Sequence, residues 1–143
     1  MTSIMVTPTT KAGCVYFLIV FATGFLMGAL RVLLIEPMVG ETRAVLLELP
    51  IMLAIAWFAS LRVISWFAVP GRLRLRLAMG GLAFVLLILA EVGVSVMAFQ
   101  RTIVAHFEAY LEPAALLGLA GQIAFALFPA AQIGFRRLDS RRE

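Results

Sequence analysis

The stretch PAALLGLAGQIAFALFPAAQIGF, residues 113–135, decides the fold. It runs for 23 residues between Glu112 and Arg136 without one charged side chain. A helix of about 20 apolar residues is long enough to cross the ~30 Å hydrocarbon core of a bilayer. This segment therefore predicts a transmembrane helix.

Three more segments share this pattern. They cover about residues 12–35, 45–69 and 77–99, and each is rich in Leu, Ile, Val and Phe with only isolated charges. One charge at the centre of a span costs only about 2.5–3.5 kcal/mol on insertion scales, so long apolar flanks still favour insertion. The sequence predicts a single transmembrane domain, residues 1–143, with an all-α fold: a four-helix transmembrane bundle joined by short loops.

The composition also indicates that the protein folds in a lipid bilayer. The chain is 63% hydrophobic and 14% charged, whereas a soluble domain is typically about 45–50% apolar and about 25% charged. A domain of this size buries only ~70% of its unfolded surface, so a core cannot hide the excess of apolar residues from water. An ordinary soluble protein, a disordered chain and a nucleic-acid-binding module are excluded.

The distribution of Lys and Arg predicts the orientation. Only Arg43 and Arg101 lie in the first and third loops, whereas the termini and the second loop carry Lys11, Arg72, Arg74, Arg76, Arg136, Arg137, Arg141 and Arg142. By the positive-inside rule, we expect both termini in the cytoplasm of a multi-pass protein of the cell (inner) membrane. The arginines expected to contact anionic lipid headgroups on that side are Arg72, Arg74, Arg76, Arg136 and Arg137.

Charges inside the first hairpin match in depth. Residues equidistant from a turn lie at similar depth in the membrane, and here Arg31 mirrors Glu48 while Glu36 mirrors Arg43. Both matches join opposite charges, so they predict a ladder of ion pairs. The ladder either fixes the pairing of the two helices or lines an accessible cleft. Arg62 has no such match, and its long side chain is expected to extend towards the headgroups.

Glu91 is the most deeply placed ionisable residue. Reflection about the third loop puts it at the depth of Gln122. We expect a hydrogen bond between the two, with the carboxyl group as donor. An ionisable group in the membrane is a candidate for function, here the handling of protons or cations. The alternative is a simple clamp between helices.

Small residues and one proline suggest how the helices pack. Gly24 and Gly28 in the first span, and Gly118 and Gly121 in the last, predict close helix contacts within the chain or between protomers. Pro129 is expected to kink the last span, where a neighbouring group must satisfy the freed carbonyl. The third loop, residues 100–112, is expected to form a short interfacial helix or to extend the third span.

The residues of common catalytic and cofactor sites are missing. With one histidine, His106, and one cysteine, Cys14, the chain cannot supply two haem ligands or a thiolate cluster. No nucleophile elbow or phosphate-binding glycine loop occurs, so no cofactor is expected and no motif assigns a family.

Three functions stay open. One is a non-catalytic accessory or assembly subunit, which would form a homo-oligomer or bind another membrane protein. Another is a lipid- or quinone-modifying enzyme. The third is a small transporter or channel for protons, cations or a small solute, which would use Glu91, Gln122, Arg31 and Glu48.

Overall fold

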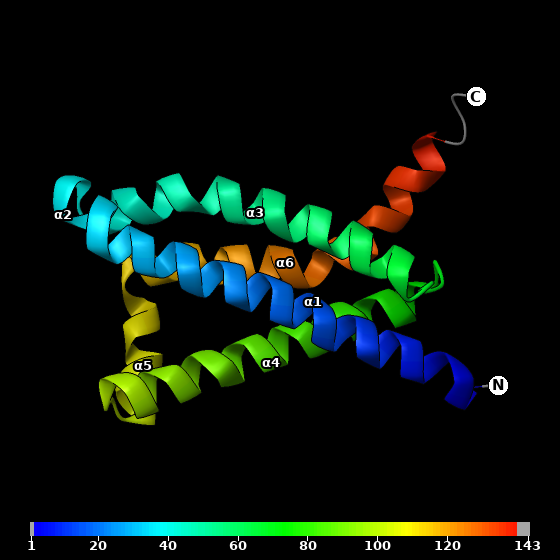
Figure 1. The fold of residues 1–143 in the computed structure, drawn as a ribbon, viewed down its shortest axis with the longest axis horizontal. Helices are drawn as coiled ribbons and strands as arrows, with labels where there is room; N and C mark the ends of the chain where they lie inside the picture. The colour runs from blue at the N-terminus through cyan, green and yellow to red at the C-terminus, as the bar shows by residue number, and fades with distance from the viewer. Residues whose placement is uncertain (1, 140–143) are drawn as a thin grey trace.

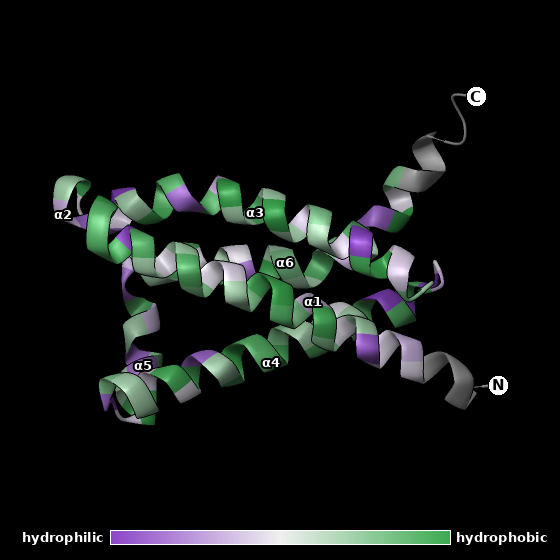
Figure 2. Ribbon diagram, in the orientation of Figure 1, coloured by the Kyte–Doolittle hydropathy of each residue, from purple (hydrophilic) through white to green (hydrophobic). Residues whose placement is uncertain are grey.

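The computed structural model describes residues 2–139, and within them the side chains of residues 7–135. This part of the chain is helical and contains no strand. Four helices are long and apolar enough to cross a membrane, which confirms the predicted four-helix bundle (Figures 1 and 2). They are α1 (Thr2–Leu30), α3 (Glu41–Trp66), α4 (Leu73–Phe99) and α6 (Pro113–Asp139).

The helices do not end where the apolar runs end. The first continues through a π-helical turn, η1 (Arg31–Ile35), and one further turn, α2 (Glu36–Val39), so that helix extends to Val39. α4 begins four residues before the expected start at Leu77, and α3 ends three residues before Val69. An apolar run marks the part of a helix inside the hydrocarbon, whereas the helix itself can continue through the polar interface or stop short of it.

Short connections join the helices. Gly40 separates α2 from α3 with φ +84°, a left-handed conformation that favours glycine. Residues 67–72 turn the chain into α4. The third connection contains α5 (Ile103–Glu108) and the 3₁₀ turn η2 (Ala109–Leu111), so it holds the expected short helix. The Thr102 hydroxyl caps α5 by accepting a hydrogen bond from the Ala105 N–H at 3.1 Å.

Each long helix packs against two others. α1 contacts α3 and α4, and α6 contacts the same two, so that α3 and α4 lie diagonally across the bundle although they are consecutive. Both termini and the turn at residues 67–72 lie at one end, and α2 and α5 lie at the other (Figure 1). We call the half of the bundle next to the termini the terminal half and the half next to α2 and α5 the loop half.

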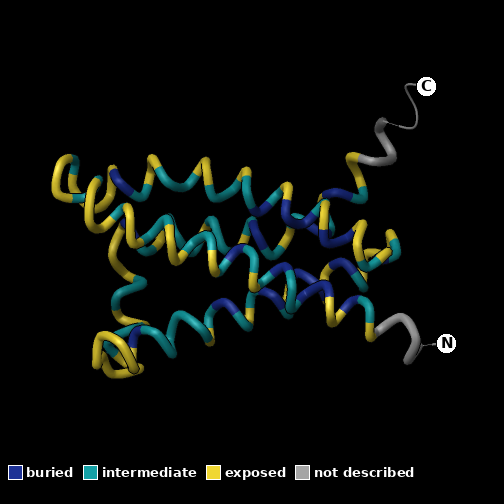
Figure 3. Tube along the Cα trace, viewed as in Figure 1, coloured by how far each residue is buried: buried dark blue, intermediate teal, exposed yellow. Residues whose placement is uncertain are grey.

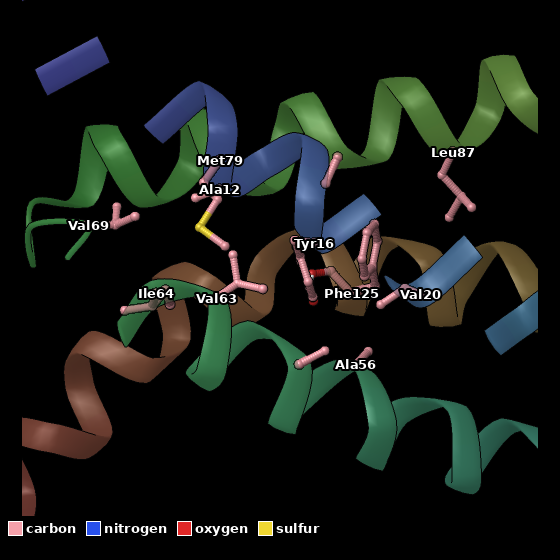
Figure 4. Close-up of a cluster of buried hydrophobic side chains, with 12 residues drawn as sticks. Ala12, Tyr16, Val20, Ala56, Val63, Ile64, Val69, Met79, Leu87 and Phe125 are labelled. Carbon is pink, nitrogen blue, oxygen red and sulfur yellow. Dashed lines mark hydrogen bonds between the residues drawn. The ribbon is translucent and has the colours of Figure 1, made fainter. Parts of the chain in front are cut away.

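Buried residues gather in the terminal half and near the middle of the bundle (Figure 3). Figure 4 shows this core between the four long helices. It consists of Ala12, Tyr16, Val20, Ala56, Ala59, Val63, Ile64, Val69, Met79, Ala83, Leu87 and Phe125.

Two glycines let the helices approach closely in this half. A Cβ atom on Gly80 of α4 would overlap the backbone carbonyl of Ala126 in α6. A Cβ atom on Gly13 of α1 would lie 3.0 Å from the carbonyl oxygen of Met79. Both positions therefore depend on the missing side chain.

The glycines predicted to pack have different surroundings. Nothing lies within 4 Å of a Cβ built on Gly28 or Gly118, and those of Gly24 and Gly121 would meet only the ends of the Met52 and Leu49 side chains. Gly28 and Gly118 therefore do not bring helices together within the chain; contacts between protomers stay a prediction. The spacing permits a close approach, but the helices are farther apart in the loop half.

Candidate functional site

The loop half contains a partly open cavity of about 650 Å³ between α1, α3, α4 and α6. Its volume falls in the roughly 300–1,000 Å³ range of small-molecule sites. The four glycines predicted to pack line it, and their missing side chains help to create the space. The polar residues on its wall are Arg31, Glu41, Glu48, Glu91, Ser95, Arg101, His106, Tyr110 and Gln122.

Glu91 is the centre of a hydrogen-bonded group in this cavity. Gln122 Nε2 donates to Glu91 Oε1 at 2.6 Å, so the pair expected from depth matching is present. The direction differs from the expectation, because the amide is the donor. Tyr110 OH donates to the second carboxyl oxygen, Oε2, at 3.1 Å. Two donors facing two oxygens suit a carboxylate, which can only accept hydrogen bonds.

The sequence did not single out Tyr110. It lies in η2, which packs against α6, and its side chain reaches Glu91 of α4. The one signal was a hydroxyl-bearing aromatic residue in a loop of mixed polar and apolar residues. Burial, and the nearby Glu91 carboxylate, raise the pKa of Tyr110 to about 12. The phenol therefore remains a hydrogen-bond donor at neutral pH.

Two polar atoms beside this group have no partner. Nε2 of His106 and Oε1 of Gln122 are buried without a hydrogen bond to any described residue. The His106 ring lies edge-on to Tyr110, with centroids 5.4 Å apart. Buried polar groups are usually satisfied, and exceptions often mark places where water, an ion or a ligand binds.

Arg31 forms the second polar group of the cavity. Its Nε lies 2.7 Å from Glu48 Oε2, so the predicted pair is present, and its Nη1 lies 3.6 Å from Glu36 Oε2. The second predicted pair, Glu36 with Arg43, is wrong. Arg43 is exposed and forms no ion pair with any described residue. In the π-helical turn residues five apart stack, which places Glu36 directly beyond Arg31.

The charges of Arg31 and Glu91 are compensated in different ways. The Arg31 guanidinium has two carboxylates, whereas no cation of the described residues lies within ion-pair distance of Glu91. Gln122 and Tyr110 stabilise its charge only as neutral donors. His106 on the same wall acts on this carboxyl group through space but forms no ion pair with it. Glu91 is therefore a carboxyl group beside a cavity with no ion-paired cation among the described residues.

The cavity ends where the terminal half begins, and a tyrosine fixes that boundary. Tyr16 OH donates to the backbone carbonyl of Phe125 at 2.9 Å. This carbonyl is four residues before Pro129, which has no N–H to donate to it. The expected rescue of a carbonyl freed by Pro129 is confirmed, and the donor comes from the diagonally placed α1.

Arg76 closes the terminal half and corrects a prediction. It is only 4% exposed, so the predicted contact with lipid headgroups is wrong. Its guanidinium donates to the carbonyls of Val69 at 3.1 Å, Pro70 at 3.0 Å and Pro129 at 3.5 Å. The turn at residues 67–72 and α6 present these carbonyls, and they satisfy the charge inside the protein.

Gln132 adds a further link between α6 and α3. Its Nε2 donates to the Trp57 carbonyl at 2.9 Å, and its Oε1 accepts from Ser60 Oγ at 2.9 Å. Trp57 itself packs edge-on against Phe128 and Phe135, with centroids 5.2 and 5.3 Å away. The terminal half is thus closed by polar contacts as well as by apolar packing.

The remaining candidate arginines belong neither to the polar group around Glu91 nor to the one around Arg31. Arg62, Arg72 and Arg74 are exposed, while the side chains of Arg136 and Arg137 lie outside the described residues. No cluster of potential metal ligands occurs in the part of the chain that the structure describes.

Comparisons with models of known families, with curated proteins and with solved structures give no match.

Proposed function

We propose that this small membrane protein binds a small organic cation in the loop-half cavity, as the loading step of transport. The observation that carries the proposal is Glu91, a carboxyl group that lies beside a 650 Å³ cavity and has no cationic partner among the described residues. The accessory-subunit and enzyme interpretations stay predictions. The cavity and its uncompensated carboxyl group favour binding of a solute.

The chemistry of the wall defines the ligand. A carboxylate held away from water is costly unless a counter-charge approaches it. A cation beside Glu91 would supply that charge, while aromatic side chains such as Phe21, Phe25 and Phe99 offer apolar surface to its body. A compact ligand with one positive charge and an apolar group fits both features.

The shape of the bundle supports access from one end. The loop half is open around the cavity, and the terminal half is closed by Tyr16, Arg76 and Gln132. The count of Lys and Arg predicts that the loop end lies outside the cytoplasm, so the ligand would enter from that side. A reporter active only in the cytoplasm, fused after Glu143, should then be on; a signal from a reporter active only outside would contradict this orientation.

Binding of benzyltrimethylammonium to the purified protein in detergent tests the proposal. We expect saturable binding that Glu91→Gln weakens at least about tenfold, which corresponds to about 1.4 kcal/mol. Glu41→Gln, which removes an exposed carboxylate at the same cavity, is the matched control and should weaken binding less than about twofold. The neutral isostere neopentylbenzene should bind less tightly than the cation.

Two outcomes would contradict the proposal. One is an absence of binding by the wild type, and the other is equal binding by Glu91→Gln. In the second case Glu91 would only join helices. Transport is tested separately as flux of the same cation into proteoliposomes, where Glu91→Gln should be stable but inactive.

A further inference from the structure

A shallow apolar groove runs along the outer face of α3, away from the cavity. It has a volume of about 710 Å³, and Ile19 of α1 contributes to its wall. Its other residues follow one face of α3 at helical spacing: Pro50, Ile51, Ala54, Ile55, Phe58, Ala59, Arg62 and Trp66. Ala54 is exposed and small, so the groove is hollow between its larger neighbours.

One charged residue lines this groove. Arg62 is exposed, and it forms no ion pair or hydrogen bond with any described residue. In this respect it differs from Arg76, which is buried and bonded to carbonyls. A positive charge at one end of an apolar groove is complementary to a molecule with an anionic head and a hydrocarbon chain.

The position of Arg62 along α3 suits a lipid. It lies four residues before the last residue of the helix, Trp66, or about 6 Å along the axis. Tryptophan is enriched at the membrane interface, and an arginine side chain can extend from a slightly deeper position to the headgroups. From Arg62 to Pro50 the groove runs about 18 Å, roughly the thickness of one leaflet of hydrocarbon.

We propose that this groove is a binding site for an anionic phospholipid, with its phosphate on Arg62 and one acyl chain along α3 past Ala54. The site is separate from the loop-half cavity and does not depend on its function. Net charge distinguishes the lipid: the ammonium group of a zwitterionic headgroup cancels the phosphate charge, whereas phosphatidylglycerol keeps it.

Native mass spectrometry of the purified protein tests the site, with phosphatidylglycerol and phosphatidylcholine of identical acyl chains in equal amounts. We expect the wild type to retain about fivefold more phosphatidylglycerol, the preference that one arginine at an anionic headgroup supplies. Arg62→Gln should abolish this preference. Arg43→Gln, which removes an exposed arginine at the opposite end of the bundle, should preserve it.

A second variant tests the groove itself. Ala54→Trp fills the hollow but retains Arg62, so it should reduce binding of both lipids. Glycerophosphoglycerol, which has the headgroup without acyl chains, should not compete with phosphatidylglycerol. Competition by this compound, or unchanged binding by Ala54→Trp, would show a site for phosphate alone and overturn the proposal. An equal preference for phosphatidylglycerol in Arg62→Gln and the wild type would also overturn the proposal.

Discussion

The terminal half and the loop half contain the same kinds of residue, glycines and isolated polar side chains, yet only the terminal half is tightly packed. The difference lies in their partners. In the terminal half, Tyr16, Arg76 and Gln132 donate to backbone carbonyls. In the loop half, Arg31 and Glu91 interact with other side chains.

This difference has a mechanical consequence. A carbonyl belongs to the helix itself, so a side chain bound to it fixes one helix against another. Two long side chains that meet across a gap constrain their helices less and can separate when a ligand arrives. The comparison predicts that stability depends on the terminal half and ligand binding on the loop half.

The largest effect should come from Gly80→Ala. The new Cβ would overlap the Ala126 carbonyl, so α4 and α6 must move apart. We expect a loss of about 3 kcal/mol of unfolding free energy, at the upper end for overpacking. Gly118→Ala, with open space around its Cβ, should be neutral or stabilising by up to about 1 kcal/mol. Unfolding in detergent, followed by circular dichroism, measures both. Equal stability of the two variants would remove the proposed contrast.

Arg76→Met should be the next most damaging. It leaves the carbonyls of Val69, Pro70 and Pro129 without the donors they have in the wild type, and hydrogen bonds to charged groups are worth about 1.5–3 kcal/mol. We expect a loss of about 2 kcal/mol in the same unfolding assay. The control Arg74→Met changes an exposed arginine and should stay within about 0.5 kcal/mol of the wild type. A similar small change for Arg76→Met would mean that the carbonyl contacts do not hold the terminal half together.

Tyr16→Phe should cost about 1–2 kcal/mol, because it leaves the Phe125 carbonyl without a donor. The cost should shrink in a Pro129→Ala background, where the new backbone N–H can donate to the same carbonyl. A double-mutant cycle on unfolding free energies measures this coupling. If the two changes add without coupling, Tyr16 does not compensate for the backbone N–H that Pro129 lacks.

The Arg31–Glu48 pair should show a smaller effect. It is partly exposed, with side chains 21% and 14% accessible, so we expect a coupling energy of about 0.5–1 kcal/mol. Arg31→Glu combined with Glu48→Arg should recover much of the loss from either single change. A recovery is expected to be incomplete because Arg31 also contacts Glu36. A coupling energy near zero would show that the pair does not stabilise the loop half.

The smallest effect concerns Tyr110. Its pKa is raised from the ordinary value of 10.0 to about 12, so the folded state favours the neutral phenol. The contribution of the protonated phenol to folding stability is fully present below pH 10 and is lost as the pH rises through 12. An ultraviolet absorbance titration should show a tyrosine that ionises near pH 12, and Tyr110→Phe should remove it. Ionisation of that tyrosine near pH 10 would mean that Tyr110 is not held against Glu91.

Depth along the membrane normal was predictable from the sequence. The pairs Arg31–Glu48 and Glu91–Gln122 both followed from counting residues away from a turn, because each residue of a helix advances a fixed ~1.5 Å. The count failed for Glu36, where a π-helical turn changed the spacing. Counting residues also could not predict the contact of Tyr110 with Glu91, because the position of Tyr110 depends on how the third connection folds back.

By itself, the sequence determined the solvent, the four spans and the depth of their polar residues, because apolar length and helical rise are properties of each segment alone. Only the tertiary structure decided which helices are neighbours and what each side chain meets. It placed Gly80 against a backbone and Gly118 beside a cavity, and it buried Arg76 but left Arg62 exposed. The physical reason is that lateral position and rotation in a bundle arise from the packing of all helices at once, and no single segment encodes them.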